Sequence, residues 1–269
     1  MYPRILHLYG PMWINSYGLM IALGFLLFVY FTAMNPRREK LLSIPKFLDA
    51  LFIGLLCGII GGRILFVIEN FNEFRRSGWL EAFYPWVGGF SLLGTMIAIL
   101  IVMPFYLRWH KVKILPFLDL VTIYAPLLQS IARIGCFLAG CCYGKVASKT
   151  LKWAVCYTHH DCLSPLCVRL HPTQLYSSIA SFIIFLIIRF IISTRAKKVG
   201  QIAFSYLILE SAARFVVDFW RGDRGLVNLG IKSLNKIFSF YQILALILFV
   251  VSIFGMIWVS KKGKKIKKR

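Results

Sequence analysis

The sequence predicts an all-α, polytopic membrane protein with about seven transmembrane helices. Hydrophobic residues make up 59% of the 269 residues, charged residues only 16%, and the mean hydropathy is +0.73. Soluble domains are about half apolar and about a quarter charged, so the composition excludes a soluble or a disordered chain. Apolar stretches long enough to cross a bilayer lie near 16–34, 47–69, 88–108, 114–138, 174–194, 200–220 and 238–260.

The distribution of basic residues predicts how these helices are oriented. The chain holds 32 Lys and Arg against 10 Asp and Glu. Segments 35–46, 108–113 and 195–199 and the tail 261–269 together hold 17 of the basic residues and a single acid, Glu39. Cytoplasmic segments are enriched in Lys and Arg, so we expect the N-terminus outside and the basic tail in the cytoplasm. There the tail would contact anionic membrane lipid, and we expect no nucleic-acid partner.

Arginines inside or beside the apolar stretches are the main functional signal. Such a residue costs at least ~2.5–3.5 kcal/mol on insertion and therefore needs a partner or a ligand. Asp218 lies between Arg214 and Arg221 at helical spacing, so the three share one helix face, and Glu210 extends this face. Two interpretations remain open. The charges form an ion-pair network that holds the bundle together, or they bind an anionic phospholipid headgroup, which suits the planar guanidinium.

Glycine-rich patches adjoin the other arginines of these stretches. Gly89 lies in a patch with Gly88, and Gly135 follows Arg133 by two residues. Small residues let helices pack closely and let a backbone approach a ligand. Their recurrence beside Arg63 and Arg133 favours a site over packing alone.

Cysteines mark the segment of about 139–172, which we expect to be a Cys-rich outer loop. Six of the seven cysteines lie between Cys136 and Cys167. An oxidising compartment allows disulfides, but sequence cannot choose among the pairings. His159, His160 and Asp161 lie among them, which makes a zinc site conceivable. Disulfides, a metal and free thiols therefore remain alternatives, and a catalytic thiol at Cys141 or Cys142 has no neighbouring base in the sequence.

Ordered motifs along the chain resemble those of the prolipoprotein diacylglyceryl transferases. The matching segments are Ser16-Tyr17-Gly18-Leu19-Met20, Gly61-Gly62-Arg63-Ile64, Gly88-Gly89-Phe90-Ser91, the signature from Ala132 to Gly144, Leu170-His171-Pro172-Thr173-Gln174-Leu175-Tyr176, Arg214 to Arg221, and Ser239 to Leu244. Each motif alone is weak, but the ordered set covers nearly the whole chain, which we treat as a single transmembrane domain of residues 1–269.

The resemblance implies an activity. Such enzymes move the diacylglyceryl group of phosphatidylglycerol to the lipobox cysteine of a preprolipoprotein signal peptide and release glycerol 1-phosphate. It implies a location in the bacterial inner (cytoplasmic) membrane and no cofactor. Alkyl transfer to sulfur needs a thiolate, and the departing phosphate needs cationic stabilisation.

The resemblance also assigns roles to residues of this chain, with no metal ligand among them. Arg133 and Arg214 become the headgroup and leaving-group clamps, and His171 becomes the candidate base. The expected substrate-binding residues are Tyr17, Arg63, Gly89, Gly135, Gln174, Tyr176, Asp218 and Arg221.

Several positions depart from the family pattern. Leu93-Gly94-Thr95 replaces a motif that begins with histidine, and Cys136, Ala139 and Cys141 replace the signature Asn, Asn and Glu. Ser177 replaces the Glu after the His-Pro motif. Two further hypotheses therefore stay beside the lipoprotein transferase: a phospholipid-dependent transferase of the same fold with another acceptor, and a non-catalytic lipid-binding membrane protein.

Overall fold

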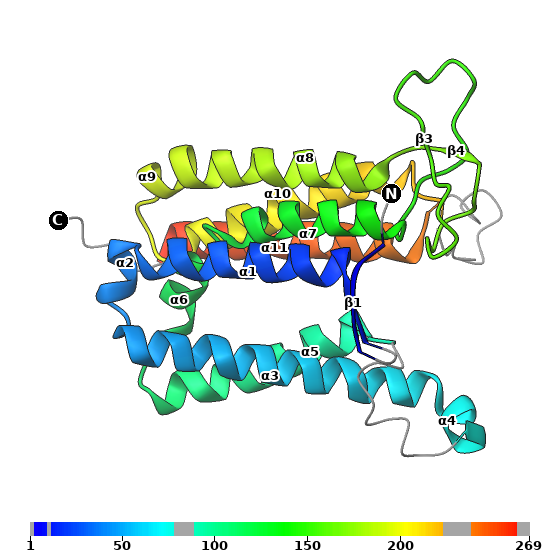
Figure 1. Ribbon diagram of the computed structural model, residues 1–269. Coiled ribbons are helices and arrows are strands. Elements are labelled where there is room, and N and C mark those ends of the chain that lie inside the picture. Colours follow the sequence, from blue (N-terminus) through cyan, green and yellow to red (C-terminus); the bar gives the residue numbers. More distant parts are fainter. Residues whose placement is uncertain (1–2, 10–11, 78–88, 223–237, 263–269) are drawn as a thin grey trace. The chain divides into compact units, whose positions relative to one another are not determined.

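The computed structural model describes residues 3–9, 12–77, 89–222 and 238–262, and they are mostly helical (Figure 1). Four helical segments are long and apolar enough to cross a membrane. They are Ser16–Ala33 (α1), Ile44–Glu69 (α3), Thr173–Arg195 (α8, η3 and α9) and Phe240–Lys262 (α11). Helices Ile114–Val121 (α6) and Ala125–Ala139 (α7) form a fifth candidate span, bent by 47°. The chain is therefore an all-α membrane protein.

Two further helices complete the list of long helices in the described residues. They are Leu92–Trp109 (α5) and Gln201–Asp218 (α10). Each of the seven expected stretches overlaps a helix or a helix pair. However, α5 and α10 are not among the candidate spans, so the count of seven and the orientation remain predictions. Most of the basic tail, residues 263–269, lies outside the described residues, as does Gly88.

The chain divides into two compact units. The first consists of Met1–Tyr9, Trp13–Thr32 and Leu118–Arg269, and the second of Gly10–Met12 and Ala33–Phe117. The expected single domain remains a prediction.

In the second unit, α3 packs along α5 through glycines, and Phe71–Ser77 (α4) follows α3 (Figure 1). A Cβ atom on Gly61 would lie 2.3 Å from that of Ala98, and one on Gly94 would lie 2.3 Å from the Gly61 carbonyl oxygen. The Thr95 hydroxyl donates to the Gly58 carbonyl at 3.0 Å. The glycines are therefore explained by close helix packing.

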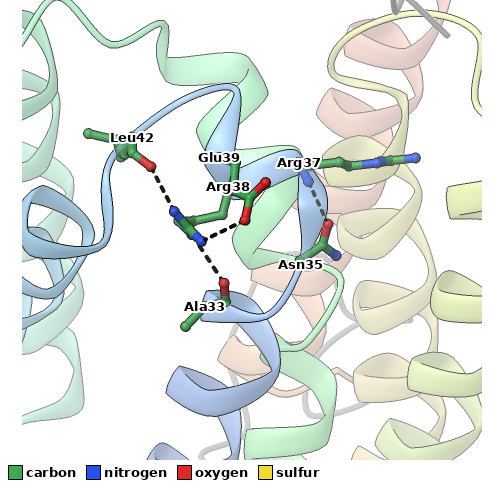
Figure 2. A network of polar contacts seen from close by, with 6 residues as sticks. All are labelled: Ala33, Asn35, Arg37, Arg38, Glu39 and Leu42. Atoms are coloured by element: carbon green, nitrogen blue, oxygen red, sulfur yellow. Dashed lines mark hydrogen bonds and ion pairs between the residues drawn. The ribbon is translucent and has the colours of Figure 1, made fainter. Parts of the chain in front are cut away.

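A buried arginine organises the chain after α1, where Pro36–Glu39 forms the short helix α2 (Figure 2). Arg38 is only 6% exposed. Its guanidinium donates to the carbonyl oxygens of Ala33 and Leu42, at 3.1 and 3.3 Å, and contacts Glu39 at 3.4 Å. Carbonyls at a helix end need such donors. Arg38, one of the basic residues from which the orientation was predicted, thus stabilises the turn around α2.

The helices of the first unit lie side by side (Figure 1). Helix α7 packs against α8 (Thr173–Leu186), and α10 packs against α8 and α11. The Ser130 and Ser178 hydroxyls each donate to the other residue's carbonyl at 2.9 Å, which joins α7 to α8. A π-helical segment, η3 (Ile187–Ile192), continues α8 and leads into α9 (Ser193–Arg195).

Within the described residues, four short strands accompany these helices. Strands Arg4–Tyr9 (β1) and Met12–Asn15 (β2) pair with each other before α1. In the segment 139–172, Val155–Cys156 (β3) pairs antiparallel with Arg169–Leu170 (β4). Buried Tyr157, Cys162 and Leu170 form a small core beneath this pair. Burial raises the pKa of the Cys162 thiol and that of the Tyr157 hydroxyl above their ordinary values, so both stay protonated at neutral pH.

The N-terminus of α10 is capped from another helix. The Asp119 carboxylate, only 4% exposed, accepts from the backbone N–H groups of Gly200 and Ala203. Such N–H groups lack partners within their own helix, and a carboxylate satisfies them while complementing the positive end of the helix dipole. This contact fixes where the charged helix begins.

Asp119→Ala is expected to lower the free energy of unfolding by about 2 kcal/mol, because two buried N–H groups lose their acceptor. The apparent melting temperature in detergent would measure the loss. Asp119→Asn keeps one acceptor oxygen and should lose less. Asp49→Ala removes an exposed carboxylate of α3 and should leave the melting temperature unchanged; an equal loss in this control would contradict the capping role.

Candidate active site

Charged residues gather where α7, α8 and α10 meet. Helix α7 contains one charged residue, Arg133, α8 contains none, and α10 with the next turn contains Glu210, Arg214, Asp218 and Arg221. We call these five residues the arginine site. Arg133, Arg214 and Glu210 line one small cavity of about 10 Å³, together with Gln129, Ser177 and Ser181. The cavity is large enough for about one water.

The two carboxylates of the arginine site have protein partners. Glu210 accepts a hydrogen bond from the Gln129 amide and interacts with the charges of Arg133 and Arg214. Asp218 is 1% exposed and accepts a hydrogen bond from the Ser239 hydroxyl. Three arginines face two carboxylates, so the site has a surplus positive charge if all five are ionised.

Tyr241 of α11 supports two of the arginines. The Cζ atom of Arg214 lies 5.3 Å from the centre of the Tyr241 ring, and that of Arg221 lies 5.9 Å from it. A ring face attracts cations by about 0.5–2 kcal/mol. The ring therefore holds two like charges near each other, whose repulsion would otherwise separate them. Tyr241 was missed as a site residue, although it lies in the recognised segment from Ser239 to Leu244.

Three thiols lie beside the arginine site. All seven cysteines are free, and the Sγ atoms of Cys136, Cys141 and Cys142 lie within 4.8 Å of one another. Cys142 interacts electrostatically with Arg133 and Arg221. The sequence showed the cysteines but not their convergence, which depends on the turn after α7. His159, His160 and Asp161 also lie together, and Arg4 contacts Asp161 at 3.4 Å.

The segment around His171 joins the thiols to α8. His171 Nδ1 lies 3.3 Å from the Tyr176 hydroxyl, which also accepts from Trp153 at 2.8 Å. Gln174 is 1% exposed, and its amide donates to the Cys141 carbonyl at 2.8 Å and to the Tyr157 hydroxyl at 3.1 Å. Gln174 therefore positions the turn after α7 that carries Cys141 and Cys142, which we call the thiol turn.

Tyr17 and Gly135 lie where α1 packs on α7. Tyr17 is 41% exposed and interacts electrostatically with Arg133. A Cβ atom on Gly135 would lie 3.0 Å from Met20 Cβ and 3.3 Å from Tyr17 Cα. Close packing of α1 therefore accounts for this glycine.

Arg63 and Gly89 belong to the second unit and contact each other. The Arg63 guanidinium donates to the Gly89 carbonyl at 3.0 Å and lies 5.7 Å from the ring centres of Phe66 and Phe74. Gly89 has a φ of +83°, and a Cβ atom there would lie 2.0 Å from Phe66. The sequence predicted that Arg63 lies beside a glycine patch, and its hydrogen bond to Gly89 places it beside one within this unit.

Apolar helices around three arginines and two carboxylates define an integral membrane protein with a polar site inside a helical unit. A family model described as prolipoprotein diacylglyceryl transferase matches residues 3–258. The chain therefore belongs to the prolipoprotein diacylglyceryl transferase family and is an enzyme of the transferase class.

Curated relatives agree with this assignment. A Clostridium tetani protein named phosphatidylglycerol–prolipoprotein diacylglyceryl transferase is 33% identical over 91% of this chain and 94% of its own length. A Clostridium perfringens protein with the same name and the suffix 2 is 32% identical over 87% of this chain and 89% of its own length. A Polaromonas naphthalenivorans protein named phosphatidylglycerol–prolipoprotein diacylglyceryl transferase is 26% identical over 95% of this chain and 94% of its own length.

Gly144 lies between the thiol turn and the arginine site, and its close backbone contacts predict that a side chain there lowers stability. A Cβ atom there would lie 2.3 Å from the His171 carbonyl oxygen and 2.9 Å from that of Trp220. Gly144→Ala should therefore destabilise the protein by about 1–3 kcal/mol, measured by thermal unfolding in detergent. Gly18→Ala is the control, because nothing lies within 4 Å of its Cβ position and alanine favours a helix by up to about 1 kcal/mol. Equal stability of the two variants would refute the close contact.

Proposed function

We propose that this protein transfers the diacylglyceryl group of phosphatidylglycerol to the cysteine thiol of a preprolipoprotein and releases glycerol 1-phosphate. The observation that carries the proposal is the cavity shared by Arg133 and Arg214, supported by relatives whose names include both substrates. The protein would be a multi-pass protein of the bacterial inner membrane, with the basic tail 261–269 in the cytoplasm.

The charge of the arginine site fits a phosphodiester. Three guanidinium groups and two carboxylates leave one positive charge, and a phosphodiester carries one negative charge. Guanidinium groups donate paired hydrogen bonds to phosphate oxygens. When the bond between the diacylglyceryl carbon and the phosphate oxygen breaks, the phosphate gains negative charge. Fixed donors that already face it stabilise that charge without reorganisation.

Arg133 and Arg214 are therefore the proposed headgroup and leaving-group clamps. Arg221 adds positive charge, and Asp218 orients the end of α10 through Ser239. The cavity between Arg133 and Arg214 holds about one water, which is too little for a headgroup. Lipid entry therefore requires side chains or helices to move, as in many enzymes that close around their substrates.

The sulfur nucleophile must lose its proton before it attacks carbon. His171 is the proposed base from the sequence motif. Its Nδ1 atom lies 3.3 Å from the Tyr176 hydroxyl. In the tautomer whose Nδ1–H donates to that oxygen, Nε2 is the atom that takes the proton. Tyr17 lies beside Arg133 and is the proposed contact to substrate from α1.

Arg133→Ala and Arg214→Ala should each lower the transfer rate about 10²–10³-fold, the usual effect of removing a transition-state donor. The assay mixes purified protein, phosphatidylglycerol and a lipobox peptide, and mass spectrometry reads the mass gain of the peptide. Arg189→Ala removes an arginine of η3 outside the arginine site and should retain activity. No mass gain with the unsubstituted protein, beside an active relative, would refute the lipoprotein reaction. Phosphatidylglycerol binding without transfer would then favour a lipid-binding protein, and consumption of the lipid would favour another acceptor.

Tyr241→Ala should lower the transfer rate by a few-fold to about 30-fold, because the ring face contributes about 0.5–2 kcal/mol to holding the two arginines. Tyr241→Phe keeps the ring face and should stay near the unsubstituted rate. The same peptide assay measures both. A loss in Tyr241→Phe as large as in Tyr241→Ala would show that the hydroxyl, not the ring face, is what matters.

A further inference from the structure

The thiols of Cys136, Cys141 and Cys142 form a compact donor set at the end of α7. Their Sγ atoms lie within 4.8 Å of one another. Around a tetrahedral zinc ion with Zn–S bonds of about 2.3 Å, sulfur atoms are about 3.8 Å apart. Small side-chain rotations would therefore bring all three onto one ion. Cys136 is buried, while Cys141 and Cys142 are partly exposed.

The backbone holds this donor set in place. Gly140 and Cys142 have positive φ angles of 76° and 57°, and the latter conformation is unusual for a residue with a side chain. The Cys141 carbonyl accepts from Gln174 at 2.8 Å, and the Cys142 carbonyl accepts from Thr173 at 2.9 Å. Both donors are 1% exposed. Backbone strain that the surroundings maintain is typical of functional sites.

The charges around the cluster suit a metal bound by thiolates. A divalent ion with three thiolates carries a net negative charge, and a fourth thiolate makes it more negative. Arg133 and Arg221 both interact with Cys142 and would balance that charge. Thiolates select soft ions such as zinc and monovalent copper.

The donor count points to a catalytic site rather than a structural one. Within the described residues, the group around Cys136 contains three cysteines and no His, Asp or Glu. Structural zinc sites use four protein ligands, whereas catalytic zinc sites use three and keep one position for water or substrate.

We propose that Cys136, Cys141 and Cys142 bind a zinc ion whose fourth position takes the thiol of the acceptor cysteine. This inference rests on the proposed transferase function and goes beyond the expectation that the site holds no metal. It explains why thiols stand at two of the positions where the resemblance implies Asn and Glu. A coordinating thiol is made strongly acidic by the ion, so its proton would pass readily to His171, the proposed base.

The transfer step is redox-neutral. The acceptor thiol binds the ion and gives its proton to His171, the proposed base. The sulfur electron pair then attacks the diacylglyceryl carbon that is bonded to the phosphate oxygen. A C–S bond forms, the C–O bond breaks, and the bonding electrons leave with glycerol phosphate toward Arg133 and Arg214. The thioether product is uncharged and a weaker ligand than a thiolate, so it can leave the ion.

Cobalt titration of the reduced full-length protein in detergent tests the metal site without phosphatidylglycerol. Cobalt reports thiolate ligands through sulfur-to-cobalt charge-transfer absorption, and competition with zinc gives the affinity. We expect one ion per chain and an affinity loss of more than about 10-fold in Cys142→Ser. Cys57→Ser and Cys156→Ser are matched controls outside the cluster and should bind as the unsubstituted protein does. Absence of binding, or equal loss in the controls, would overturn the metal site.

A second arm tests the acceptor position. A lipobox peptide should shift the cobalt spectrum, and the same peptide with serine in place of cysteine should not. Binding of cobalt without this shift would overturn the role of the fourth position.

Full transfer activity in protein shown to be free of metal would overturn the zinc proposal and leave the proposed function standing. Metal binding and a peptide shift without any transfer would instead count against the proposed function alone. A disulfide within the cluster in protein purified without reductant, with no metal bound, would overturn the proposal.

Discussion

The structure depends on keeping like charges together inside an apolar helical unit. Arg214 interacts with the positive charges of both Arg133 and Arg221 and with the negative charge of Asp218. In a low-dielectric surrounding such an arrangement is costly unless counter-charges and ring faces offset it. Glu210, Asp218 and the ring of Tyr241 supply that compensation in part. The remaining positive charge is what the proposed function assigns to an anionic ligand. The two interpretations of the buried arginines are therefore compatible: the carboxylates and the ring of Tyr241 would hold the site, and the proposed function assigns the surplus charge to the headgroup.

Backbone hydrogen bonds of the segment of about 139–172 help to fix the geometry of the arginine site. Two backbone hydrogen bonds join this segment to the residues after α10: the Lys145 N–H donates to the Trp220 carbonyl at 2.8 Å, and the Gly222 N–H donates to that of Tyr143 at 3.0 Å. These bonds place the thiol turn beside Arg221. The segment of about 139–172 is thus hydrogen-bonded to the residues at the end of α10.

Sequence alone predicted the helices and the charged face well, because hydropathy and helical spacing are local properties. The stretch 16–34 corresponds to α1 at Ser16–Ala33, and the spacing of Arg214 and Asp218 placed them on one helix. Contacts between distant segments were not predictable in this way. Asp119 caps α10 some 80 residues later, and Gln174 and Thr173 hold the turn of Cys141 and Cys142. No sequence pattern shows which carbonyl a buried amide will reach, so the convergence of the thiols and the support from Tyr241 required the structure.

The most direct test of the central claim is a structure of the protein with phosphatidylglycerol in a lipid nanodisc, determined by electron cryomicroscopy. The account predicts density for the lipid phosphate within hydrogen-bonding distance of the guanidinium groups of both Arg133 and Arg214, in a cavity widened to admit it. Phosphate density elsewhere, with Glu210 still hydrogen-bonded to Gln129 and the cavity unchanged, would contradict it. The buried arginines would then be a structural ion-pair network only.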